Sequence, residues 1–414
     1  MATTTTKPCV LIVGAGICGL TLAQCLRKQN IPFEVFEREA GPDSRPAGWA
    51  IGIHTIIGDL ITSIPEDMPP FKESVHHLSP LNLNSQFSYY LDGPRQVVQD
   101  TPETPVVRAN RFRFREWLST RIPIQWGKRV AQVEELENGV LARFDDGTTA
   151  TGDILVGADG INSIVRENLL KRPNRDILRT VPAATITGEI VLSGEAFERQ
   201  LSLGHSSYIK SGPELPGHFL FVGLSYVNPD ANSGLYYWVL ISEDDGINKE
   251  DHWLHSASQV EKLEDVKRKT SMLDPRFTEV ITATPASGIQ KQTRIFRDAE
   301  IDNLPVGRVT LVGDAAHPMT PFRGEGGVHG MRDALNLSKA LSQLKSTNTE
   351  EIKSRLGPYQ KEILERGVAA TRASRAAQRT NTGREGRLFG WGQPAVLAPE
   401  EKVSLDACRP RQMG

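Results

Sequence analysis

Val309-Thr-Leu-Val-Gly-Asp-Ala-Ala-His-Pro-Met-Thr-Pro-Phe-Arg-Gly-Glu-Gly-Gly327 is the stretch that decides the fold. It begins as an apolar strand that ends at an acid, Asp314, and continues through a proline-broken loop into a glycine-rich turn that opens a helix. Backbone N–H groups at a helix start favour a bound group with negative charge, whereas an acid just after a strand suits a sugar or ribityl hydroxyl. The stretch therefore predicts one wall of a site for a large cofactor that carries both kinds of group.

A second glycine-rich turn lies near the N-terminus. Gly14, Gly16 and Gly19 form the pattern G-x-G-x-x-G between an apolar strand at 10–13 and a helix. The first glycine permits a tight turn, the second lets a pyrophosphate approach the backbone, and the third allows the helix to pack closely on the strand. Glu37 ends the next strand, where an acid can accept hydrogen bonds from the ribose of an adenosine. Together the two glycine-rich turns predict FAD as the cofactor.

Length and composition limit the remaining possibilities. The chain has 414 residues, which favours two domains over a single core. Its 48 basic and 50 acidic residues give no electrostatic basis for binding nucleic acid. No apolar run approaches the roughly 20 residues that span a bilayer, the N-terminus lacks a signal peptide, and four cysteines are too few for a disulfide framework. The composition therefore predicts a cytoplasmic protein.

The order of strands and helices predicts an α/β fold with an inserted antiparallel-sheet domain and C-terminal helices. Strand-like segments alternate with loops between residues 180 and 290, and the α/β pattern resumes at Val309. Helices are expected over 331–344 and 350–379, with Gly357-Pro358 interrupting the second. We expect a Rossmann-like FAD-binding domain over 1–72, 101–178 and 286–382, a substrate domain over 73–100 and 179–285, and a loosely ordered tail over 383–414.

Three further segments complete a family resemblance. Ala158-Asp-Gly-Ile-Asn-Ser-Ile-Val-Arg166 follows a strand, Arg111 starts the pattern Arg-x-x-Phe-x-x-x-Leu, and Ala50 lies in a Gly- and Pro-rich segment, 40–58, that is expected to be a loop. With the two glycine-rich turns, these segments resemble the single-component FAD-dependent monooxygenases of the para-hydroxybenzoate hydroxylase type, in the branch of fungal secondary metabolism. The resemblance implies the glutathione-reductase-like form of the Rossmann fold. It also implies these cofactor contacts: Gly14, Gly16, Gly19, Glu37, Arg38, Ala50, Arg111, Asp159, Asp314, Pro321, Gly324, Gly326 and Gly327.

Two positions depart from the family pattern. Glu325 stands where the family usually has glutamine, and a negative charge there would disfavour an anionic reduced flavin unless it faces away or is neutralised. Related fungal enzymes are expected to carry an arginine as a candidate catalytic group in the strand at 185–192. That strand contains no arginine here, so the role is not carried over.

The activity that the resemblance implies is a monooxygenation. NADPH or NADH would bind transiently and reduce FAD, oxygen would form a flavin hydroperoxide, and one oxygen atom would hydroxylate or epoxidise a small apolar secondary metabolite. The alternatives are a halogenase or a reductase on the same fold, and a non-catalytic flavin-binding scaffold. The halogenase is disfavoured because the pattern Trp-x-Trp-x-Ile-Pro is absent.

The sequence offers fewer candidates for catalytic and substrate-binding residues than for cofactor contacts. His317 could deprotonate a phenolic substrate, although a histidine held by hydrogen bonds in its loop is an equal alternative. His54, Tyr208 and Tyr237 are candidates for the substrate pocket, with core packing as the alternative for the tyrosines. No metal site is predicted, since His76-His77 has no partners at ligand spacing. The oligomeric state stays open.

Overall fold

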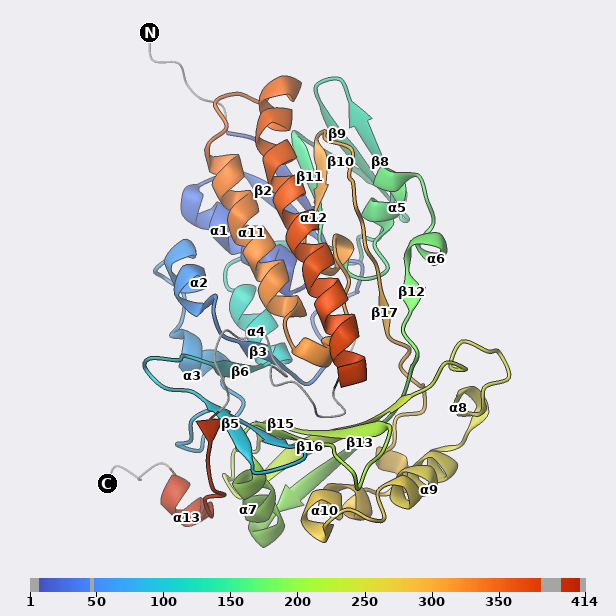
Figure 1. The fold of residues 1–414 in the computed structure, drawn as a ribbon. Coiled ribbons are helices and arrows are strands. Elements are labelled where there is room, and N and C mark those ends of the chain that lie inside the picture. Colours follow the sequence, from blue (N-terminus) through green and yellow to red (C-terminus); the bar gives the residue numbers. More distant parts are fainter. Residues whose placement is uncertain (1–6, 45–47, 381–395, 410–414) are drawn as a thin grey trace.

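The structure is a computed structural model that describes residues 7–44, 48–380 and 396–409. Figure 1 shows an α/β part, which carries two long helices side by side, above a broad sheet whose far face is covered by helices. The long helices are α11 (Gly326–Ser342) and α12 (Thr349–Thr380). The buried apolar side chains of the α/β part and of the sheet's helix-covered face form separate clusters. These features confirm the predicted α/β fold with an inserted sheet domain.

The α/β part is built on a parallel sheet. Its central strand is buried on both faces, which explains the uninterrupted apolar run Val10-Leu-Ile-Val13. Because the strands are parallel, their carboxyl ends meet at one edge of the sheet, where ligands bind in open α/β folds. In spatial order the strands are β18 (Val309–Leu311), β11 (Ile154–Gly157), β1 (Val10–Val13), β2 (Phe33–Phe36) and β7 (Ile124–Gln125).

Helix α1 (Ile17–Gln29) follows β1 and ends at Asn30, which adopts the left-handed conformation. Its buried face, which includes Leu22 and Leu26, packs between the parallel sheet and α11. At its N-terminus no side chain of the described residues caps the free N–H groups, and the first turn holds no acidic residue. The start of α1 therefore keeps its positive end available for a ligand.

Helix α12 is continuous through Pro358, so the predicted interruption at Gly357-Pro358 is wrong. The side chains of Ile352, Leu356 and Ile363 are fully buried on both sides of the proline. This continuous apolar contact with the core outweighs the loss of one helical hydrogen bond at proline. No helix in the described ranges combines the length and the apolar character that a membrane crossing needs.

The second part is a seven-stranded, mainly antiparallel sheet. Its residues alternate between a face that packs on helices and a face that looks toward the α/β part. The helices that cover the first face are α7 (Gly194–Leu203), α9 (Gln259–Lys269) and α10 (Pro275–Ala283) (Figure 1). In spatial order the strands are β13 (Ala183–Ser193), β16 (Ser233–Glu243), β15 (His218–Val227), β14 (Ser207–Lys210), β4 (Gln86–Tyr90), β5 (Gln96–Gln99) and β19 (Val396–Leu397).

The predicted loose tail over 383–414 is corrected for residues 396–409, the part that the structure describes. Strand β19 pairs with β5, and α13 (Leu405–Cys408) follows it. Val403 and Leu405 are buried in the apolar cluster of the sheet domain, and the Leu405 N–H donates to Glu198 Oε1 at 2.7 Å. These contacts join residues far apart in sequence, so the local composition of the tail did not indicate them.

Candidate functional site

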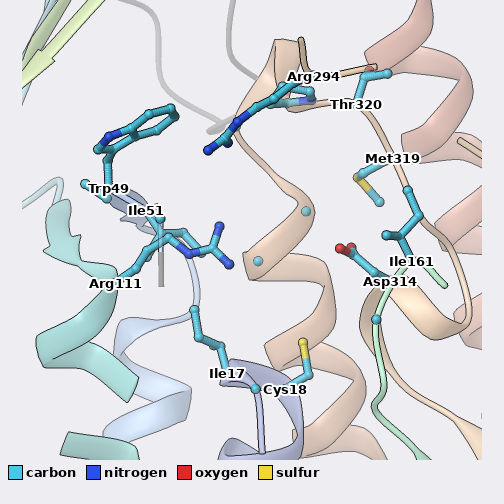
Figure 2. A pocket seen from close by; sticks show the side chains of 18 of the residues that line it. Ile17, Cys18, Trp49, Ile51, Arg111, Ile161, Arg294, Asp314, Met319 and Thr320 are labelled. Atoms are coloured by element: carbon cyan, nitrogen blue, oxygen red, sulfur yellow. The ribbon is translucent and has the colours of Figure 1, made fainter. Parts of the chain in front are cut away.

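A cavity of about 620 Å³ lies between the carboxyl edge of the parallel sheet and the inner face of the second sheet. Twelve of the thirteen predicted cofactor contacts line it; the exception is Gly19. Figure 2 shows Asp314 and Arg111 pointing into the same space from opposite walls. The cavity therefore brings together the motifs that the sequence distributes over more than three hundred positions, from Gly14 to Gly327.

The first glycine-rich turn shows why each glycine is needed. Gly14 has φ +112°, and a Cβ there would lie 2.4 Å from the carbonyl oxygen of Ala158. A Cβ at Gly19 would lie 2.1 Å from the Gly14 carbonyl oxygen, so this glycine serves helix–strand packing rather than cavity lining. At Gly16 an added Cβ would meet no protein atom within 4 Å. The turn thus leaves room for a pyrophosphate at the start of α1.

The adenosine end of the predicted site is marked by Glu37. Its carboxylate is buried and accepts the Ala15 N–H at 2.9 Å, which fixes it at the cavity wall beside Arg38. Lys128 and Arg129 also line this end and were not predicted. They follow β7, a strand of two residues that is too short to give a periodic signal.

The Asp-Gly motif follows β11 of the parallel sheet and leads into helix α5 (Ile164–Leu170). Asp159 Oδ2 accepts the N–H groups of Ile164 and Val165 at 2.7 and 3.2 Å, whereas its buried Oδ1 has no partner among the described residues. Burial raises the pKa of Asp159, although these hydrogen bonds oppose the rise. Arg166, which is fully buried, donates to the carbonyl oxygens of Asp314 and Ala315. The motif therefore both lines the cavity and supports the turn that carries Asp314.

Asp314 lies in the single turn Gly313–Ala315 after β18. Its carboxylate is open to the cavity but deep in the fold, and this enclosure raises its pKa, partly offset by the charges of His317, Arg111 and Arg166. A carboxylate at this place can accept hydrogen bonds from ribityl hydroxyls.

We expect Asp314→Ala to weaken FAD binding roughly tenfold or more, the usual loss for a hydrogen bond to a charged group. Titration of the apoprotein with FAD, followed by flavin fluorescence, measures this change. Asp302→Ala, which removes an exposed acid outside the cavity, is the matched control. Equal FAD affinity of wild type and Asp314→Ala would show that this acid does not contact the cofactor.

The wall opposite Asp314 comes from a strand that was expected to be a loop. Strand β3 (Ala50–Ile53) pairs antiparallel with β6 (Val107–Asn110), a contact between distant segments that composition alone does not reveal. Ala50 lines the cavity, and so does Arg111, the first residue of α4 (Arg111–Leu118). A Cβ at Gly327 would lie 2.1 Å from Ile51 Cδ1, so this glycine lets the start of α11 approach β3. Pro321, Gly324 and Gly326 complete this wall.

Glu325 does not bring an uncompensated charge to the cavity. Its carboxylate accepts hydrogen bonds from Arg323 Nε at 2.8 Å and Nη2 at 3.3 Å, and its side chain does not contribute to the cavity lining. The charge of Glu325 therefore both faces away from the cavity and is neutralised by Arg323, so this departure from the family pattern does not disfavour an anionic reduced flavin. In the part of the chain that the structure describes, no side chain caps α11, so its first N–H groups stay available beside Gly326 and Gly327.

His317 does not line the cavity. It is buried, and its Nε2 lies 2.6 Å from Asp333 Oδ2. Burial lowers the pKa of His317, but the charge and the hydrogen bond of Asp333 raise it overall. This placement favours the alternative, a histidine held by hydrogen bonds in its loop, over a catalytic base.

Of the three candidate substrate residues, only Tyr237 lines the cavity. Its ring stacks on Trp49 with centroids 4.2 Å apart. Tyr208 lies on the opposite face of the sheet, where its hydroxyl donates to Gln200 at 2.9 Å. His54 is buried beside the cavity rather than in its lining, and burial lowers its pKa to about 4.

The substrate end of the cavity is mainly aromatic and aliphatic. Alternate residues of the sheet face it, together with two hydroxyl-bearing threonines of β13, Thr185 and Thr187. Two arginines that were not predicted, Arg108 and Arg294, also line the cavity. The apolar side chains of this end are Phe87, Tyr89, Ile209, Phe219, Phe221, Tyr237, Val239, Ile241, Phe296 and Phe322.

The residues present fit FAD. An open helix start beside Gly16, an acid at the adenosine end, a buried Asp159 oxygen with no partner among the described residues, and Asp314 near a second glycine-rich helix start lie along one continuous cavity. The helix start would hold the pyrophosphate, Glu37 the ribose, and Asp314 the ribityl chain.

Comparisons with known proteins agree with this geometry. The FAD binding domain family matches residues 7–177 and 239–374. The FAD-dependent monooxygenase thnD of Trichoderma harzianum is 48% identical over 372 residues, which cover 88% of this chain and 92% of that protein. The crystal structure of Klebsiella pneumoniae HpxO complexed with FAD and uric acid has a TM-score of 0.70 at 21% identity, covering 92% of this chain and 91% of that one. The structure of 2,6-dihydroxypyridine-3-hydroxylase from Arthrobacter nicotinovorans has a TM-score of 0.70 at 19% identity, covering 97% and 100%. The chain therefore belongs to the FAD binding domain family and is an FAD-dependent monooxygenase.

Proposed function

We propose that the protein uses NADPH or NADH and oxygen to hydroxylate or epoxidise a small, mainly apolar secondary metabolite. The observation that carries this proposal is the continuity of the cavity from the dinucleotide-binding edge to the aromatic face of the second sheet. FAD, when bound, supplies the electron transfer and the oxygen activation. The residues of the chain bind it, orient the substrate beside it and keep water out.

An aromatic contact between the two parts of the molecule lines the cavity and supports a water-poor reaction space. Trp49, from the segment that lines the predicted flavin end, stacks on Tyr237 of β16, and its indole N–H donates to Glu189 Oε1. Arg294 lies over the Trp49 ring at 4.3 Å. The two parts of the molecule are thus in direct contact beside the cavity.

The reductant is proposed to bind transiently. The sequence holds a single G-x-G-x-x-G, so no second dinucleotide domain supports a resident nicotinamide cofactor. The name of the relative from Trichoderma harzianum supports monooxygenation, and the uric acid in the HpxO structure supports a small substrate in this fold. We further propose that the protein acts in the cytoplasm.

The test measures turnover of the FAD-loaded protein. We expect NADPH or NADH oxidation that consumes oxygen and accelerates when a substrate from a panel of aromatic and polyene metabolites is added. With isotopically labelled oxygen gas, one labelled atom should enter the product. A product labelled from water, a halogenated product in the presence of bromide, or reduction without oxygen uptake would contradict the proposal.

A further inference from the structure

Arg108 is a buried cation in the substrate end of the cavity. Its side chain extends from β6, only 3% of the residue is exposed, and it lines the cavity. Nη2 lies 2.5 Å from the Tyr237 hydroxyl, and the guanidinium lies 5.6 Å from the ring centroids of Phe221 and Tyr237. Within the described ranges, Nε has no hydrogen-bond partner and the guanidinium makes no ion pair with a carboxylate.

A buried guanidinium without a counter-charge is costly, so proteins normally place a carboxylate beside it. Here the acid on the same face of the sheet, Glu189, accepts the indole N–H of Trp49 instead. Asp100, beyond the strand β5, pairs with Lys72 at 2.5 Å. The described part of the chain therefore leaves the charge of Arg108 to be balanced by something in the cavity.

Glycine residues next to Arg108 leave room for its side chain. A Cβ at Gly223 would lie 2.6 Å from Arg108 Nη2 and 3.0 Å from Tyr237 Cε1, so this glycine makes room for the pair. In the β3–β6 ribbon, Arg108 is opposite Gly52, which also lines the cavity. The guanidinium thus lies where the predicted flavin wall meets the aromatic wall of the sheet.

We propose that Arg108 and Tyr237 form a subsite for one ionised oxygen of the substrate. The substrate class is then an apolar, mainly aromatic molecule with a carboxylate or an acidic phenol or enol, rather than a neutral hydrocarbon. Arg108 supplies charge-assisted hydrogen bonds and the Tyr237 hydroxyl supplies a further donor, while the surrounding rings exclude water and strengthen both. This inference rests on the proposed function, because it names the substrate of that same cavity.

Two matched pairs of probes test the subsite without turnover. Calorimetric titration of the FAD-loaded protein compares benzoate with benzamide, and 4-nitrophenolate with 4-nitroaniline; each pair differs mainly in charge. We expect at least one anion to bind roughly tenfold to a hundredfold more tightly than its neutral partner. The pair that shows the preference tells whether a carboxylate or a phenolate is recognised.

Arg108→Gln is expected to abolish the preference, and Tyr237→Phe to reduce it, because the cation remains. Arg113→Gln is the matched control: Arg113 lies on α4, outside the cavity, and donates to the His76 carbonyl oxygen. No preference for either anion, including no measurable binding, or a preference lost in Arg294→Gln but kept in Arg108→Gln, would overturn the subsite. Because these titrations need no reaction, a failure of the monooxygenase assay and a failure of the subsite are separate results.

Discussion

A Gly16→Val variant is expected to fold normally and to lose FAD. The backbone at Gly16, with φ −82° and ψ −177°, is extended and accessible to valine, and an added Cβ meets no protein atom within 4 Å. The new methyl groups would instead occupy the space at the start of α1 that a pyrophosphate needs. Crowding of about 3 kcal/mol corresponds to roughly a hundredfold weaker binding. Flavin absorbance after gel filtration and a titration of the apoprotein with FAD measure the effect.

Gly58→Val is the matched control for this variant. Gly58 lies on α2 (Ile57–Ser63), is exposed, and likewise has no atom within 4 Å of an added Cβ. We expect it to keep full FAD content and, like Gly16→Val, to unfold at a denaturant concentration close to that of wild type. Full FAD content in Gly16→Val would mean that the pyrophosphate does not lie at this helix start.

The cofactor half of the site was predictable because its signals are local. Gly14, Asp159 and Asp314 each follow a short apolar strand, and parallel strands bring their carboxyl ends to one edge. Placing these three residues at one edge of the sheet requires no knowledge of side-chain packing. The strand β3 escaped prediction for the opposite reason, since it exists only through its pairing with β6, more than fifty residues away in sequence.

The substrate half could be predicted only as a set of alternatives. Alternation indicates that Tyr208 and neighbouring residues belong to two faces, but not which face meets the cavity. The choice depends on helices α7 and α10, which cover the face that holds Tyr208 and Trp238. Arg294 lies in an irregular segment, outside the helices and strands, where periodicity carries no information.

The strand at 185–192 shows how a missing residue can be informative. Thr185 and Thr187 line the cavity there, while Arg108 reaches the same end of the cavity from β6. A cation is thus present in the cavity although the strand that was expected to carry one does not. Sequence spacing could not show this, because the approach of β6 to Tyr237 depends on the docking of the two parts.

Of the buried charges near the turn that carries Asp314, Asp333 is expected to be the one whose removal destabilises the fold most. Its Oδ2 accepts the Gly313 N–H at 2.7 Å and lies 2.6 Å from His317 Nε2, and its Oδ1 accepts Arg366 Nη2 at 2.6 Å. Asp333→Ala would leave buried His317 without its carboxylate partner and Arg366 paired with Glu362 alone. We expect the free energy of unfolding to fall by about 3–5 kcal/mol, as measured by urea denaturation.

Asp298→Ala separates general destabilisation from an effect on the site. Asp298 is also fully buried, and it holds Arg375 through hydrogen bonds of 2.8 and 2.6 Å, so a similar loss of stability is expected. Only Asp333, however, accepts the Gly313 N–H, at the start of the turn that carries Asp314. Asp333→Ala should therefore weaken FAD binding under conditions where both variants remain folded, while Asp298→Ala should not. Equal FAD affinity in the two variants would mean that the Asp333 network stabilises the helices without positioning Asp314, because the turn would then hold its conformation through Arg166 and its own backbone hydrogen bonds.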